Sequence, residues 1–301
     1  FWYGDEGIFA AVARNLNQGG VLYQSGWDNK PPMIYLTYAG IFSLFGVSMF
    51  WLRMITAIFV LATTAVIYEI GRETIGKHRA LLASFLFGFF TSLRIIEGNL
   101  ALTEIFMILP ISLAMYIGIR RKFDYLSLLG AGALFAIASL YKQVGAFEAA
   151  ALGIYVFLIT PKFLDFIKKG FVLTFGFSVP FIITSLYFFS KGILGEYIFG
   201  AYTYYSIYLN ESPTYARLIN ISKFLPAISA ILYGVYKKFK AVKVNHVHLF
   251  MLWVAFSFMG AYFSGRTYGH YLVQVTPGVA LLLASMKFSN IRVSVARSVF
   301  I

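Results

Sequence analysis

The sequence predicts an all-α polytopic membrane protein, with about nine transmembrane helices and two juxtamembrane helices ahead of them. Hydrophobic residues make up 59% of the 301 residues and charged residues only 12%, whereas a typical soluble domain is about 45–50% apolar and about 25% charged. A soluble globule of this length could not hide so much apolar surface, because its exterior must remain polar. The apolar residues also gather in runs of membrane-spanning length, and basic residues occupy every second connection between the runs.

Two short helices are predicted before the first span. Residues 5–17 carry apolar side chains at helical spacing but are too few to cross a bilayer, so they predict a helix lying in the membrane interface. Pro31 and Pro32 suit the first turn of a second helix over about 31–45. We therefore expect residues 1–47 to form the first external loop.

Residues 48–301 are predicted to form one transmembrane bundle, so that the chain is a single membrane domain. Crossing a hydrocarbon core of about 30 Å takes about 20 apolar residues, and about 17 is the lower limit. Nine runs come close to or exceed that length: 48–71, 79–95, 100–119, 125–141, 143–160, 170–190, 222–237, 247–264 and 270–286. The tyrosine-rich stretch 191–221 is expected outside as a loop or interfacial helix, serving either as an aromatic belt or as a sugar platform.

The net charge of +13 follows from the same topology. Sixteen of the 25 Lys and Arg residues lie in alternate connections: Arg72, Lys77, Arg79, Arg120, Arg121, Lys122, Lys162, Lys168, Lys169, Lys237, Lys238, Lys240, Lys243, Lys287, Arg292 and Arg297. Basic loops mark the cytoplasmic side of a membrane protein, so this charge indicates orientation and not a nucleic-acid partner. The chain has no Cys, which excludes disulfides and thiolate metal sites.

Ten ionisable residues within or near the predicted spans fall on the predicted external side, and they come from five separate stretches of chain. They are Asp5, Glu6, Asp28, Lys30, Arg94, Glu97, Glu104, Lys142, Arg266 and His270. Each has a structural explanation as well: acids favour a helix start, Lys30 could anchor at the interface, and His270 could be a core residue. Glu104 and Glu148 lie in apolar runs, where a carboxylate has to be paired, hydrated or protonated.

Several of these residues belong to a pattern that resembles the integral-membrane GT-C glycosyltransferases, and most closely the protein-mannosyltransferase-like branch that includes the aminoarabinose transferases. The first loop carries Asp5-Glu6, Gly19-Gly20 and the run Trp27 to Pro32, followed by Phe45-Gly46 and Arg53. Thr103-Glu104, Lys142-Gln143, Gly265-Arg266, His270-Tyr271 and Pro277 follow in the same order as later landmarks of that group. The family starts with a further span before the Asp-Glu motif, so we expect this chain to lack an upstream span.

The resemblance implies a transferase that takes its sugar from a polyprenyl-phosphate-linked donor at the external membrane surface and inverts the sugar carbon. It implies that Asp5 is the general base or orients the acceptor, with Glu6 as its motif neighbour and Glu104 as the second acid. Lys30 is expected to hold the donor phosphate. Further phosphate or donor contacts are assigned to Arg266, His270 and Lys142, and supporting positions to Asp28, Glu97 and Tyr271.

The chemistry of such a transfer needs a base for the acceptor proton and cations for the departing phosphate, and the external face supplies both. A divalent ion at Asp5 and Glu104, with Glu97, is an open possibility, as is a proton or a hydrogen bond there. The acceptor could be protein, lipid or polysaccharide. The alternative hypothesis is a polytopic transporter or flippase of lipid-linked intermediates, which would require broken helices and paired charges at midplane in two repeated halves.

Overall fold

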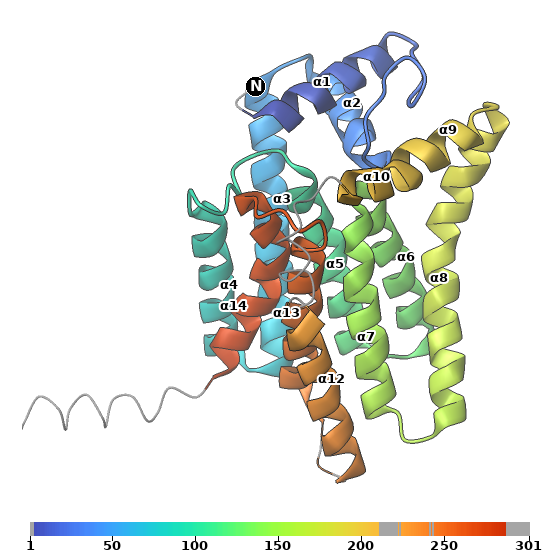
Figure 1. Ribbon diagram of the computed structural model, residues 1–301. Helices are drawn as coiled ribbons and strands as arrows, with labels where there is room; N and C mark the ends of the chain where they lie inside the picture. The colour runs from blue at the N-terminus through green and yellow to red at the C-terminus, as the bar shows by residue number, and fades with distance from the viewer. Residues whose placement is uncertain (1–2, 211–221, 223, 241, 243, 287–301) are drawn as a thin grey trace, which may run out of the picture.

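Every regular element longer than a single bridge that the structure describes is a helix, and no β-strand occurs in that part of the molecule (Figure 1). The computed structural model describes residues 3–210, 222, 224–240, 242 and 244–286. The two short N-terminal helices, α1 (Gly4–Asn17) and α2 (Met33–Phe45), begin within two residues of their predicted positions. The predicted all-α class is confirmed.

Every predicted span corresponds to a helix. These are α3 (Met49–Thr74), α4 (Lys77–Ser92), α5 (Thr103–Arg120), α6 (Tyr125–Tyr141), η1 (Gln143–Gly145) with α7 (Ala146–Ile159), α8 (Phe163–Ser190), α12 (Phe224–Phe239), α13 (His246–Ala261), and η3 (Gly269–Val275) with α14 (Thr276–Ser285). Among the described helices, only α3, α5 and α8 are both long and apolar enough to cross a membrane by length and composition alone. The count of nine crossings therefore stays a prediction.

Helix α5 is the inner helix of the bundle. Within its most apolar stretch of 18 residues, 72% is buried inside the protein, compared with 22% for α3 and 17% for α8. A helix that is apolar on all sides is normally an enclosed one, and α5 presents apolar residues around its whole circumference. Its first turn, with Thr103 and Glu104, is buried at the end of the bundle that carries α1.

Helices α6 and α8 pack at very short range through two glycines. A Cβ atom at Gly132 would lie 2.2 Å from the Leu173 carbonyl oxygen, and one at Gly176 would lie 2.1 Å from the Leu129 carbonyl oxygen. Small residues allow this close approach of backbones, which is the usual basis of helix association in lipid. The contact holds α8 to the bundle although most of its surface is uncovered.

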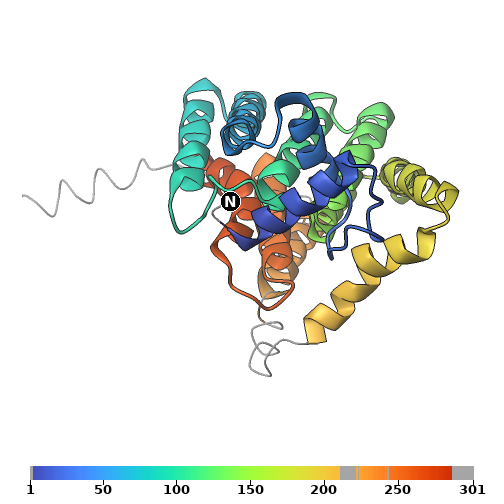
Figure 2. The same cartoon turned by 90° about the horizontal axis from the view of Figure 1, so that it is seen from above.

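One end of the bundle carries α1, α2 and the short helices that follow α8. Helix α1 lies across that end, as Figure 2 shows from above, and Phe9 packs edge-on against Tyr35 and Tyr38 of α2. The segment that follows α8 returns across the same end as α9 (Leu194–Ile198), η2 (Phe199–Thr203) and α10 (Tyr204–Asn210). The Gln143 amide donates to the Ala201 carbonyl and joins this segment to the bundle.

The opposite end carries the basic connections, including those after α3, α5 and α7 (Figure 1). Four basic residues counted in the sequence, Lys243, Lys287, Arg292 and Arg297, lie outside the described residues, as do 211–221 of the predicted external stretch. The described acids and cations of the first loop and the described basic connections therefore lie at opposite ends of the bundle.

Candidate active site

A polar pocket of about 280 Å³ opens at the end of the bundle beneath α1. Its walls come from five parts of the chain: the region of α1, the loop before α2, the start of α5, the residue before η1, and η3 with the loop that leads into it. The lining residues are Tyr3, Asp5, Ile8, Asp28, Asn29, Lys30, Thr103, Glu104, Lys142, Arg266, Tyr268, His270 and Tyr271. Eight of the ten predicted site residues thus share one pocket.

Asp5 occupies the first turn of α1 and is half-buried in the pocket wall. Its carboxylate has no hydrogen bond or ion pair with any other described residue. The neighbouring Tyr3 hydroxyl is partly enclosed, and burial together with the charges of Glu97 and Asp5 raises the pKa of Tyr3 to about 12. The pocket therefore places the Asp5 side chain close to a phenol that stays protonated at neutral pH.

Glu6 lies outside the pocket. Its fully buried carboxylate receives two hydrogen bonds from the Arg53 guanidinium, at 2.5 Å and 2.9 Å, and a third from the Ala101 amide at 2.8 Å. Arg53 also donates to the Asn99 carbonyl at 2.8 Å. The Asp-Glu pair is therefore divided, because successive helical residues point about 100° apart. We assign Glu6 to positioning α1, not to contact with substrate.

The loop before α2 presents Lys30 to the pocket. Tyr35 donates a hydrogen bond to Asp28 at 2.7 Å, and the Asn29 amide donates to the same carboxylate at 2.8 Å. The Tyr23 hydroxyl holds the Lys30 carbonyl at 2.8 Å. The Lys30 ammonium itself donates to the neutral Asn29 amide oxygen at 2.8 Å, and no carboxylate of the described chain forms an ion pair with it.

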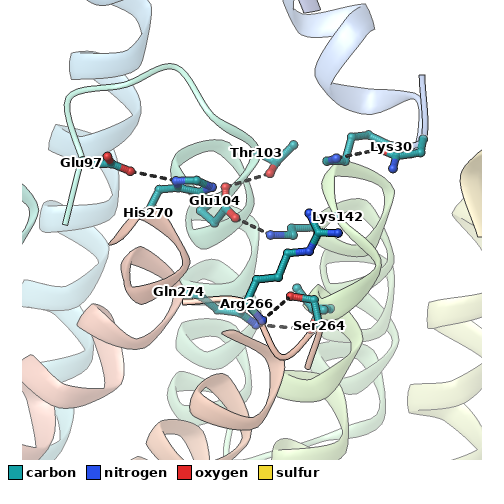
Figure 3. Close-up of polar contacts among 11 residues, drawn as sticks. Lys30, Glu97, Thr103, Glu104, Lys142, Ser264, Arg266, His270 and Gln274 are labelled. Atoms are coloured by element: carbon teal, nitrogen blue, oxygen red, sulfur yellow. Dashed lines mark hydrogen bonds and ion pairs between the residues drawn. The ribbon is translucent and has the colours of Figure 1, made fainter. Parts of the chain in front are cut away.

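Glu104 and Lys142 form a buried ion pair at 2.5 Å (Figure 3). Thr103 donates a second hydrogen bond to Glu104 at 2.8 Å, and the Lys142 ammonium lies 3.7 Å from the centre of the Tyr271 ring. The sequence left open how Glu104 would be compensated, and the structure supplies a lysine 38 positions away. Lys142 lines the pocket as predicted, but its charge is used on Glu104.

His270 is held by Glu97 and by aromatic rings. Its Nδ1 lies 2.9 Å from the Glu97 carboxylate (Figure 3). The Tyr268 ring stacks on the imidazole at 5.5 Å, and the Tyr3 ring meets it edge-on at the same distance. Glu97 does not line the pocket itself, and its contact with the site is the one to His270.

Arg266 enters the pocket from the loop before η3, and its side chain extends towards Lys142 in Figure 3. Its backbone amide donates to the Ser264 hydroxyl at 3.4 Å. With Lys30 on the other wall, it gives the pocket a second cation beyond the Glu104–Lys142 pair. Lys30, Arg266 and Asp5 are thus three charged side chains that line the same cavity.

The residues present do not make a good metal site. Among the described residues, no group of three or more His, Asp or Glu side chains is arranged to hold a metal ion. Of the predicted ligands, Glu104 is paired with Lys142 and Glu97 with His270. A divalent cation between Asp5 and Glu104 would compete with an ammonium already in place. The function proposed below therefore includes no step on a metal.

The sequence did not identify two further polar contacts. Arg53 was part of the family pattern, but nothing in sequence linked it to Glu6, 47 positions away. Glu148 accepts hydrogen bonds from Ser257 at 2.7 Å and Gln274 at 2.8 Å. The hydrogen bond from Gln274 to Glu148 joins η3, the element that carries His270, to α7.

Comparison with known proteins agrees with this geometry. A family model described as dolichyl-phosphate-mannose-protein mannosyltransferase matches residues 29–188, a little over half of the chain. The chain belongs to this family. The match covers the loop with Lys30, the first turn of α5 and Lys142, and it confirms the resemblance drawn from the sequence motifs.

Two individual proteins extend the comparison with this mannosyltransferase family. An uncharacterised protein of Aquifex aeolicus is 31% identical over 212 residues, which are 67% of this chain and 49% of the relative. The crystal structure of ArnT from Cupriavidus metallidurans bound to undecaprenyl phosphate superposes with a TM-score of 0.61 at 18% identity. That match covers 94% of this chain and 55% of ArnT, and it shows a shared multi-pass, all-helical membrane fold. The chain spans about half the length of both proteins.

Proposed function

We propose that this protein transfers a sugar from a polyprenyl-phosphate-linked donor to an acceptor at the external face of the membrane, with inversion at the sugar carbon. The observation that carries the proposal is the meeting of Asp5, Lys30 and Arg266 in one pocket. These residues come from distant parts of the chain, and together they supply a base without a protein partner and two cations. Family membership and the undecaprenyl phosphate bound to ArnT support the class of donor.

In the proposed reaction, the acceptor hydroxyl oxygen attacks the anomeric carbon of the donor sugar. The bond from that carbon to the phosphate oxygen breaks, and its electron pair leaves with the polyprenyl phosphate. Asp5 takes the hydroxyl proton as the general base. Lys30 and Arg266 stabilise the extra negative charge on the phosphate through charge-assisted hydrogen bonds.

Other residues in and around the pocket keep these groups in place. The Glu104–Lys142 pair forms the floor of the pocket, and its balanced charge keeps the second acid from repelling the phosphate. Glu97 orients the imidazole of His270, which faces the donor side of the cavity together with Arg266. Glu6 and Arg53 attach α1 to the bundle and so fix the position of Asp5. Asp28 holds the loop that carries Lys30.

The test separates binding of the carrier from chemistry. Purified protein in detergent is given a radiolabelled polyprenyl-phospho-sugar with extracted membrane acceptors, and undecaprenyl phosphate binding is measured separately by thermal shift. Asp5→Asn is expected to lower product formation at least about 100-fold, which is the usual contribution of a general base, while binding persists. Lys30→Ala is expected to weaken carrier binding about tenfold.

The control is Glu73→Gln, the same type of change at an exposed site near the opposite end of the bundle, which should alter neither readout. Full turnover of Asp5→Asn would remove the base role. A wild-type protein that binds undecaprenyl phosphate but never forms product in detergent, where no compartments exist, would favour the transporter or flippase hypothesis.

A further inference from the structure

A second polar pocket lies at the opposite end of the bundle from the candidate active site. It has a volume of about 530 Å³ and lies between the α5–α6 turn and the α7–α8 turn, at the bottom of the bundle in Figure 1. Its polar lining residues are Lys122, Asp124, Tyr125, Thr160, Asp165 and Lys169. The proposed reaction uses none of them.

The charges of this second pocket leave an excess of positive charge. Asp124 is already engaged, because it pairs with Arg121 at 2.9 Å and accepts the Ser127 amide at 2.8 Å as the cap of α6. Lys122, Lys169 and Asp165 form no ion pair with any other described residue. Two ammonium groups therefore face the cavity against one carboxylate, which favours a ligand with a single negative charge.

Thr160 gives the pocket an unsatisfied buried group. Its side-chain oxygen is buried and has no hydrogen-bond partner in the described part of the molecule, although the residue is only 6% exposed. Its carbonyl is already used, since the Lys238 ammonium donates to it at 3.0 Å. A buried hydroxyl without a partner costs free energy, so a ligand oxygen that accepts a hydrogen bond from Thr160 would remove that cost.

A separate apolar groove is lined on α8 from Phe166 onwards, the residue that directly follows Asp165 of the second pocket. It has a volume of about 420 Å³ and runs between α7 and α8, over Phe166, Gly170, Leu173 and Phe177. On α7 it is lined by small residues, Ala146, Ala149, Ala150 and Gly153. From Phe166 to Phe177 a helix rises about 16 Å, which is roughly half the hydrocarbon thickness of a bilayer.

We propose that these two cavities together form a binding site for an anionic glycerophospholipid of the leaflet opposite the candidate active site. The phosphate would lie between Lys122 and Lys169 with the Thr160 hydroxyl donating to it, and an acyl chain would fill the groove along α7 and α8. Asp165 favours a headgroup that donates hydrogen bonds, as the glycerol hydroxyls of phosphatidylglycerol do. One net positive charge in the pocket matches the single negative charge of that lipid.

The experiment titrates phosphatidylglycerol into delipidated wild-type protein and counts bound lipids by native mass spectrometry. The variant Lys122→Ala with Lys169→Ala is expected to bind the lipid at least tenfold more weakly, since each basic residue near an anionic headgroup adds about one kcal/mol. The matched control is Lys162→Ala with Lys168→Ala. These two lysines lie close to Lys169 in sequence, at the α7–α8 connection, but neither lines the pocket. Equal loss in the two double variants would overturn the proposal in favour of a diffuse basic surface.

Two further measurements define the ligand. Gly170→Leu is designed to fill the groove, and a Cβ atom at this position meets only the far end of the Phe166 ring, at 4.0 Å. It should weaken long-chain phosphatidylglycerol severalfold and leave glycerol phosphate or a short-chain analogue unchanged; an equal effect on both would remove the acyl groove. Binding of phosphatidylcholine as tight as that of phosphatidylglycerol would contradict the headgroup assignment, and tight binding of glycerol phosphate alone would indicate a soluble phosphate ligand. None of these readouts depends on glycosyl transfer.

Discussion

The guanidinium of Arg53 holds both carboxylate oxygens of Glu6, and Asp5, one residue earlier, lines the polar pocket. One turn of helix α1 therefore has two separate tasks. Glu6 attaches the helix to α3 and to the loop before α5, and Asp5 presents a carboxylate to the pocket. Because the two acids are adjacent in sequence, the contact that attaches α1 to the bundle also fixes the position of Asp5.

Loss of Arg53 should loosen α1. Arg53→Ala leaves the Glu6 carboxylate buried without its cation, a situation that typically costs about 3–5 kcal/mol. Arg53→Lys should lose less, because it keeps the charge but cannot form the paired hydrogen bonds of the guanidinium. Unfolding in mixed detergent micelles measures the stability, and proteolysis within residues 1–47 reports the detachment of α1. If Arg53→Ala unfolds like the wild type, the ion pair does not anchor the helix.

Glu104 and Lys142 should behave as a coupled pair. Glu104→Gln and Lys142→Met each leave one buried charge alone, and each should lower the unfolding free energy by about 3 kcal/mol. The double variant contains neither charge, so its loss should be clearly smaller than the sum of the two single losses. The measurement is a double-mutant cycle from detergent unfolding. Strictly additive losses would show that the two side chains do not compensate each other.

Gly269 should be essential for the position of His270. A Cβ atom at this residue would lie 2.1 Å from the Ile95 carbonyl oxygen, so Gly269→Ala has to push η3 away from the loop that carries Glu97. We expect undecaprenyl phosphate to bind about tenfold more weakly, the effect of losing one charged contact. Gly7→Ala is the control, because a Cβ atom there meets no atom within 4 Å. Unchanged carrier binding in Gly269→Ala would exclude His270 from the donor site.

Gly176 should determine whether α8 stays attached. Gly176→Ala would place a methyl group against the Leu129 carbonyl, and overpacking of this kind typically costs about 1–3 kcal/mol. Gly88→Ala, at a mid-helix site with open space around it, should instead stabilise by about 0.5–1 kcal/mol. Thermal unfolding of the two variants side by side gives the sign of each effect. A stable Gly176→Ala would mean that α8 is held by other contacts.

The sequence predicts the helices well because their causes are local. Apolar length fixes the helices of the bundle, and Pro31 with Pro32 fixes the start of α2 within two residues. The meeting of Asp5, Lys30 and Arg266 also followed from sequence, since alternating basic loops place the stretches that carry them on the same side of the membrane. Helix α8 begins seven residues before its predicted start, because Lys168 and Lys169 extend it past the apolar run.

The contacts between side chains could not be predicted in the same way. Nothing in sequence distinguishes Asp5 from Glu6, because only the rotation of α1 decides which of them reaches Arg53. Lys142 was expected to bind phosphate, and its pairing with Glu104 depends on how α5 and α6 pack. The sequence leaves open whether Glu148 is paired, hydrated or protonated, and its hydrogen-bond partners, Ser257 and Gln274, are neutral residues more than 100 positions away.

Asp5 and Glu104, two of the acids that line the pocket, lie on helices that are covered by other helices to very different extents. Glu104 belongs to α5, which other helices surround, whereas Asp5 belongs to α1, which lies across the outside of the bundle. In the proposed reaction, a bulky acceptor would displace the wall formed by α1 only by breaking the Glu6–Arg53 contact. An inhibitor scaffold built on the wall formed by Glu104 and Lys142 would then meet the same shape whichever acceptor is bound.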